Sequence, residues 1–115
     1  MTFTAPQYKT EFLTESLVEQ LNIRFKVDSV ESGHNHTYLF KYDVAKKYIK
    51  VWRHDVYNGE VREGRSIFLF VDKETGAVYK PASCKAPAKG IRFYIDFLVD
   101  HPELVDQYGS FLYLR

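Results

Sequence analysis

The chain has little of what marks several common classes of protein. Its 115 residues include one cysteine, four prolines and six glycines. The single cysteine, Cys84, cannot form an internal disulfide, and this is typical of proteins that work in a reducing compartment. No apolar run approaches the roughly 18 residues of a membrane span, and residues 1–6 lack the basic start and apolar core of a signal peptide. We therefore expect no membrane partner and no disulfide-stapled scaffold.

The composition favours one packed domain over residues 1–115. Apolar residues make up 45% of the chain and aromatic residues 17%, which excludes a disordered protein. A domain of this length buries roughly two thirds of the surface of its unfolded chain without disulfides or metals. Residues 1–9 are expected to be an irregular lead-in.

Net charge is only +1, but it is distributed unevenly. Residues 41–92 hold 12 lysines and arginines and six acidic residues, whereas the rest of the chain holds four and nine. The middle of the chain is basic and its two ends are acidic. This pattern fits acidic helices that balance a basic sheet, and it equally fits a basic binding surface.

A β-hairpin over residues 65–81 is the clearest local signal. Residues 66–71 are an unbroken β-branched and aromatic run, residues 72–76 form a turn that ends in glycine, and residues 77–80 return. Strict alternation would place Ile67, Leu69 and Val71 on one face of the sheet, and Phe68 with Phe70 on the other.

The remaining elements are read from periodicity and turn residues. We expect a helix over residues 10–22, strands over 24–30, 37–42 and 47–53, and a loop over 54–64 that holds an Asn58–Gly59 turn. A second helix over 91–99, a proline-started turn near Pro102 and a short strand over 111–114 complete the chain. The predicted fold class is α+β: an antiparallel β-sheet of four to five strands with an N-terminal and a C-terminal helix.

Two segments resemble small proteins encoded by tailed bacteriophages, especially marine and cyanobacterial ones. The segments are residues 70–92, which read FVDKETGAVYKPASCKAPAKGIR, and the ending GSFLYLR over 109–115. The resemblance implies a viral accessory protein that works in the cytoplasm of an infected bacterial host or sits in a virion. The phage pattern has a tryptophan at the position of Cys84, which argues against a nucleophilic role for this thiol.

An aromatic and basic sheet face is the first candidate site. If the hairpins align by parity, they form one surface edged by Lys47, Lys50 and Arg53, and its rings are Tyr38, Phe40, Tyr48, Trp52, Phe68 and Phe70. Such a surface lets bases stack on rings while lysines contact phosphates, as in single-stranded nucleic-acid binding. The alternative is that these rings form a core beneath the helices or a homodimer interface.

The segment over residues 80–90 is the second candidate. Its cations Lys80, Lys85 and Lys89, followed by Arg92, lead into the start of the expected helix, where backbone N–H groups favour an anion. The glycine spacing of a nucleotide-binding P-loop is missing. A solvated basic loop is the alternative reading.

Catalytic and metal chemistry have weaker support. His34 and His36 are two residues apart and His54 lies on the next loop, but a mononuclear metal site needs three or four converging ligands. Cys84 has no histidine near it in sequence, and the acidic residues lie mostly on expected helix exteriors or turns. We expect no catalytic residue, no metal and no cofactor, and therefore no enzyme.

The sequence therefore favours a phage accessory protein that acts by binding single-stranded nucleic acid or a phosphate-bearing ligand. The residues expected to bind are Lys50, Trp52, Lys80, Lys85, Lys89 and Arg92. Two alternatives stay open. The first is a protein-interaction module, either an inhibitor of a host factor or a small virion or assembly protein, and the second is a small enzyme with a histidine site.

Overall fold

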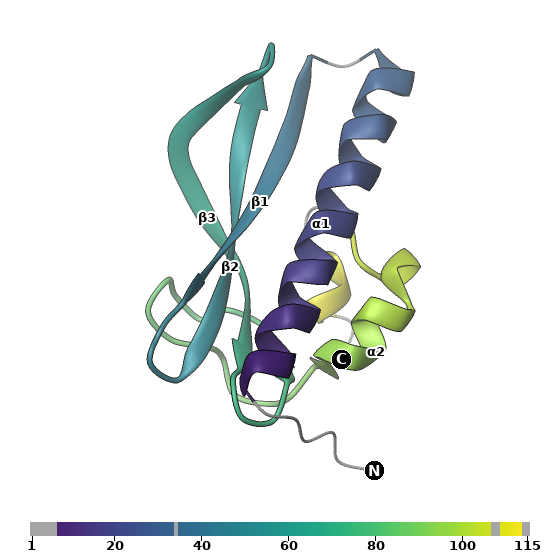
Figure 1. Ribbon diagram of the computed structural model, residues 1–115. Coiled ribbons are helices and arrows are strands. Elements are labelled where there is room, and N and C mark those ends of the chain that lie inside the picture. The colour runs from purple at the N-terminus through teal and green to yellow at the C-terminus, as the bar shows by residue number, and fades with distance from the viewer. Residues whose placement is uncertain (1–6, 34, 107–108, 114–115) are drawn as a thin grey trace.

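The structure, a computed structural model, describes residues 7–33, 35–106 and 109–113 (Figure 1). Helix α1 (Gln7–Ser32) precedes five strands: β1 (His36–Val44), β2 (Tyr48–Tyr57), β3 (Glu60–Asp72), β4 (Ala77–Tyr79) and β5 (Phe93–Tyr94). Helix α2 (Ile95–Asp100) and the 3-10 helices η1 (Pro102–Leu104) and η2 (Ser110–Tyr113) follow. The strands lie in sequence order and every neighbouring pair is antiparallel. This confirms the predicted α+β class, in which one helix precedes the strands in the sequence and another follows them.

Helix α1 is longer than the sequence predicted. It begins at Gln7, within the expected lead-in, and it continues through the strand expected over residues 24–30. Leu17, Leu21 and Phe25 are all buried, and their spacing of four extends one apolar stripe beyond residue 22. The helix ends before Gly33, whose φ of +73° is favourable for glycine at a helix end.

Strands β2 and β3 form a long hairpin where a loop was predicted over residues 54–64. Asn58 (φ 50°) and Gly59 (φ 80°) make the two-residue turn, and positive φ at both positions is typical of a type I′ turn. The Asn58–Gly59 turn is confirmed, but the strands run up to it on both sides. Residues 57–66 are all exposed, and in Figure 1 the turn reaches the level of the C-terminal end of α1. We call residues 53–66 the arm.

A shift of register between β2 and β3 changes which side chains share a face. Val51 pairs with Leu69, but the next residue, Trp52, pairs with Ile67, so Phe68 is an extra residue in β3. Phe68 and Leu69 therefore both face the helices, and the strict alternation predicted for β3 is wrong at this point. Phe68 packs against Phe40 and against Phe111, at ring-centroid distances of 4.9 and 6.0 Å.

The C-terminal segment packs on the same side as α1. The helix predicted over residues 91–99 is shorter, because residues 93 and 94 form β5 and α2 begins at Ile95. The short turn that starts at Pro102 is confirmed as η1. The strand predicted over residues 111–114 is wrong: the described part of it belongs to η2, which buries Phe111 and Leu112 in the core, while residue 114 lies outside the described residues.

Candidate functional site

The sheet has one face toward α1 and another that we call the outer face. Directly paired residues share a face, so Lys50 and Phe70 lie together on the outer face, as do Trp52 and Ile67. The single aromatic surface predicted from parity is therefore wrong. Its rings divide between the helix side (Tyr38, Phe40 and Phe68) and the outer face (Tyr48, Trp52 and Phe70).

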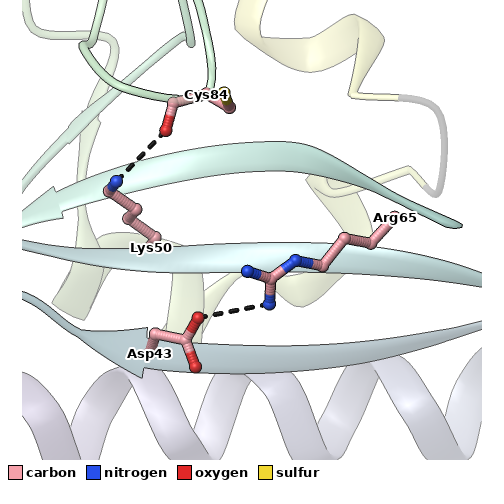
Figure 2. A network of polar contacts seen from close by, with 4 residues as sticks. All are labelled: Asp43, Lys50, Arg65 and Cys84. Carbon is pink, nitrogen blue, oxygen red and sulfur yellow. Dashed lines mark hydrogen bonds and ion pairs between the residues drawn. The ribbon is translucent and has the colours of Figure 1, made fainter. Parts of the chain in front are cut away.

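On the outer face, Trp52 is covered by Arg65. The Arg65 guanidinium carbon lies 3.7 Å from the centroid of the Trp52 ring, and Nη1 donates to Asp43 Oδ2 at 3.3 Å. Figure 2 shows Arg65 reaching from β3 across β2 to Asp43 on β1. Trp52 is only 8% exposed, so its ring offers no open face on which a base can stack.

Residues 80–92, which join β4 to β5, form a pinned loop that we call the connector. Its base is closed by hydrogen bonds from Ala88 N–H to the Lys80 carbonyl (2.7 Å) and from Arg92 N–H to the Val78 carbonyl (2.8 Å). The Ala86 carbonyl accepts hydrogen bonds from two N–H groups nearer the tip, at 3.1 Å each. The connector thus contains neither a helix nor a strand of the sheet.

Lys50 contacts the connector from the sheet. Its Nζ donates to the Cys84 carbonyl at 3.1 Å (Figure 2). Lys85 and Lys89 are exposed, and Lys80 Nζ lies 4.4 Å from the centroid of the Tyr113 ring. The structure thus brings five of the six predicted site residues onto the connector or against it. We call them the basic surface: Lys50, Lys80, Lys85, Lys89 and Arg92.

Within the described residues, no ion pair neutralises the basic surface. Residues 77–92 contain no aspartate or glutamate. The ion pairs found in the described part of the chain join other residues, in the arm, between strands and near α2. Arg92 also has a buried Nε that finds no hydrogen-bond partner among the described residues. The local excess of positive charge is therefore available to an external anion.

The opposite side of the molecule carries negative charge. In Figure 1 the connector and α1 lie on different sides of the sheet. Tyr42 faces α1, and its pKa is raised first by burial and then by the carboxylates of Glu15, Glu11 and Glu19 on that helix. The uneven charge of the sequence becomes a separation of charge in space.

The helix N-terminus expected beside the connector does not provide an anion site. Helix α2 starts three residues beyond Arg92, and the N–H of Ile95 is already bonded to the Gly76 carbonyl at 2.8 Å. The Asp96 carboxylate accepts the N–H of Phe97 at 2.8 Å. This part of the prediction is wrong because β5 intervenes and because the N–H groups of Ile95 and Phe97 already have hydrogen-bond partners.

The histidines and the cysteine are placed separately. His34 lies outside the described residues, and His36 Nε2 lies 3.1 Å from Asp55 Oδ1 with its ring stacked on Tyr57. Over residues 7–33, 35–106 and 109–113 we find no group of three or more His, Cys, Asp or Glu side chains placed to hold a metal ion. Cys84 is an exposed free thiol.

Arg65 was missed as a site residue, although the sequence held a signal for it. A two-residue turn at Asn58–Gly59 places Trp52 opposite Arg65 by simple counting across the hairpin. The observed register is shifted, so that Arg65 pairs with His54, which is two residues from Trp52 on the same strand and lies on the same face. Because residues 54–64 were predicted to be a loop, no pairing of Trp52 with Arg65 was predicted.

The fold and the basic surface define a small α+β protein in which a cationic loop packs over one face of a meander sheet. The chain belongs to a family of unknown function (DUF7717), whose model matches residues 4–114. Comparisons with curated proteins and with solved structures gave no significant match. Among the helices of the described segments, none combines the length and the apolar character needed to cross a membrane.

Proposed function

We propose that this protein acts by binding, and that the basic surface holds the phosphates of a single-stranded nucleic acid. The observation that carries the proposal is the gathering of Lys50, Lys80, Lys85, Lys89 and Arg92 at one pinned loop with no acidic residue in residues 77–92. A pinned loop loses little conformational entropy when a ligand binds.

The buried rings decide how the nucleic acid is recognised. Trp52 and Phe70 are 8% and 0% exposed, so neither of these rings offers a face on which a base can stack. Lysines contact phosphates as point charges and read no sequence. The proposed binding is therefore weak, independent of sequence and strongly dependent on salt.

The resemblance to phage proteins suggests where this binding takes place. We place the protein in the cytoplasm of an infected bacterial cell or in a virion, and we propose an accessory role without catalysis.

Fluorescence anisotropy with a labelled oligothymidine tests the proposal. The variant Lys85→Glu/Lys89→Glu reverses two exposed charges of the basic surface, and we expect its affinity to fall at least about tenfold at low salt. Because each lost phosphate contact removes about 0.7 from the slope of log K against log salt, the slope should fall by about 1.4.

The matched control is Lys9→Glu/Lys26→Glu, which changes net charge equally but lies on α1. This control should keep most of the affinity, because long-range repulsion alone weakens binding less than the loss of contacts. Equal losses in the two double variants, or no binding by the unmodified protein at low salt, would contradict the proposal.

A protein-interaction module is the second candidate, and the arm is the observation that favours it. In the described chain β4 pairs with β3 only at Phe70 and Val71, so the edge of β3 that faces away from β2 has no neighbouring strand from Glu60 to Leu69. A partner strand can add to such an edge. A stoichiometric host protein retained in a pull-down, and lost when Val61 and Gly64 are both replaced by proline, would support this candidate.

A further inference from the structure

A groove of about 530 Å³ lies between the C-terminal half of α1 and the part of strands β1 to β3 that is nearest the Asn58–Gly59 turn. Ile23 on α1 forms one wall, and Leu39, Val56 and Val61 line the strand side. Ile23 is 67% exposed and Val61 is 44% exposed. Aliphatic side chains that gather at a concave, open site are typical of ligand-binding surfaces.

The groove is preformed, because α1 is fixed to the edge of β1. Asn22 Nδ2 donates to the Phe40 carbonyl at 2.9 Å, and the Phe40 N–H donates to Asn22 Oδ1 at 2.7 Å. Thr37 Oγ1 donates to the Phe25 carbonyl at 3.3 Å. These contacts hold the helix wall at a set distance from the strands, so a ligand need not open the site.

Three side chains of the groove can donate hydrogen bonds to an anion. Of the lining residues that the structure describes, Lys26 alone is charged, and the amides of Asn35 and Asn58 line the groove with it. Among the described residues, none of these three side chains makes a hydrogen bond or an ion pair. Among the described residues of the lining, none carries a carboxylate.

We propose that this groove binds a small amphipathic carboxylate whose apolar chain lies on Ile23, Leu39, Val56 and Val61 and whose head group lies at Lys26. The volume falls within the roughly 300–1,000 Å³ of small-molecule sites. A stable protein interface needs about 800 Å² from each partner, more than this short concave site offers. This site is separate from the basic surface and does not depend on the function proposed for it.

Decanoate, used below the concentration at which it forms micelles, is the probe. Isothermal titration of the full chain should give saturable binding, with acetate testing the need for a chain and decyltrimethylammonium testing the need for a negative head. Ile23→Asp should weaken decanoate binding at least about tenfold, because it places a carboxylate among the aliphatic groups. Lys26→Glu should weaken decanoate and strengthen decyltrimethylammonium binding.

The control variant is Phe12→Asp, which changes a side chain of α1 that is equally exposed, at 65%, and lies outside the groove lining. It should bind decanoate within about twofold of the unmodified protein, and so should Lys85→Glu/Lys89→Glu. Absence of saturable decanoate binding, equal losses for Ile23→Asp and Phe12→Asp, or equal binding of both head groups would overturn the proposal. Loss of decanoate binding in the connector variant would place the ligand at the basic surface instead.

Discussion

Arg65 determines how much of Trp52 is accessible from the outer face. The guanidinium packs over the indole at 3.7 Å while its other side is held by Asp43. A guanidinium that stacks on an aromatic ring also shields it from water and from other rings. At Trp52 the outer face therefore presents the Arg65 cation and not an open aromatic ring.

Replacing Arg65 with alanine should expose the only tryptophan of the chain. We expect Trp52 emission to shift to longer wavelength, acrylamide quenching to increase, and the free energy of unfolding to fall by about 1 kcal/mol. Arg62→Ala is the control, because Arg62 lies over Tyr57 and not over Trp52. If both variants leave the emission of Trp52 unchanged, the packing seen at Arg65 does not persist in solution.

Tyr42 gives the stability of the protein a dependence on alkaline pH. Burial, followed by Glu15 and Glu11, raises its pKa above the ordinary value of 10.0. The folded state therefore keeps the phenol proton at a pH where the unfolded chain loses it. The resulting stabilisation is fully present below pH 10 and is lost as pH rises from there through the folded-state pKa.

In urea unfolding measured from neutral to alkaline pH, Tyr42→Phe should lose less stability above pH 10 than the unmodified protein. Glu15→Gln should have a smaller effect in the same direction, because it removes one carboxylate and leaves the burial. Part of the alkaline loss should persist in Tyr42→Phe, since burial also raises the pKa of Tyr79. If the free energy of unfolding falls with pH in parallel for all three proteins, Tyr42 ionises at the same pH in the folded and unfolded states.

At the scale of elements, one side chain of α1 makes two hydrogen bonds to the backbone of β1. Asn22 bonds both the N–H and the carbonyl of Phe40, as a neighbouring strand would. This pairing protects part of the β1 edge, and edges are where sheets otherwise recruit foreign strands. The residue expected to end the helix instead holds the helix against the sheet.

Asn22→Ala should lower the free energy of unfolding by about 2 kcal/mol, because it leaves two part-buried backbone groups of Phe40 without partners. It should also reduce decanoate binding, since the wall of the groove is then less fixed. Asn35→Ala is the control for stability, because the Asn35 side chain makes no hydrogen bond to a described residue. If the two substitutions lower the free energy of unfolding equally in chemical denaturation, Asn22 does not hold α1 against β1.

Elements with local causes were predictable from sequence. The turn before β4 is fixed by Asp72, whose Oδ1 accepts the N–H groups of Glu74 and Thr75, and by Gly76 at a φ of +76°. These are neighbours in the chain, so the residues alone indicate the structure. The pairing of β1 with β2, which are joined by the turn at residues 45–47, was predictable for the same reason.

Elements with long-range causes were not predictable. Residues 24–30 alternate as a strand would, but Phe25 packs on Phe40 from a helix, at a ring distance of 5.9 Å. The extra residue at Phe68 depends on the space that Phe111 fills from the far end of the chain. The contact between Lys50 and Cys84 depends on the path of the connector, which no pattern within residues 80–92 specifies.

At the scale of the whole molecule, the three long strands have two different surroundings. Near the core, Ile49, Val51 and Leu69 are fully buried beneath the helices. Farther along the same strands, residues 57–66 are exposed and the β3 edge has no neighbouring strand in the described chain. The same sheet thus has one part in the packed core and another, the arm, with little apolar burial. Because apolar burial opposes local opening of a strand pair, the arm should open more readily than the core.

Hydrogen exchange measured along β2 and β3 should therefore show a gradient. We expect amides of residues 49–52 and 68–71 to exchange only with global unfolding, and amides of the arm to exchange at least about a hundredfold faster through local opening. Saturating decanoate should slow exchange in the arm and in α1 near Ile23, because its groove joins both, while oligothymidine should slow exchange in the connector. Equal protection along the whole length of both strands would mean that the arm belongs to the core, and that its exposure is not available for a partner.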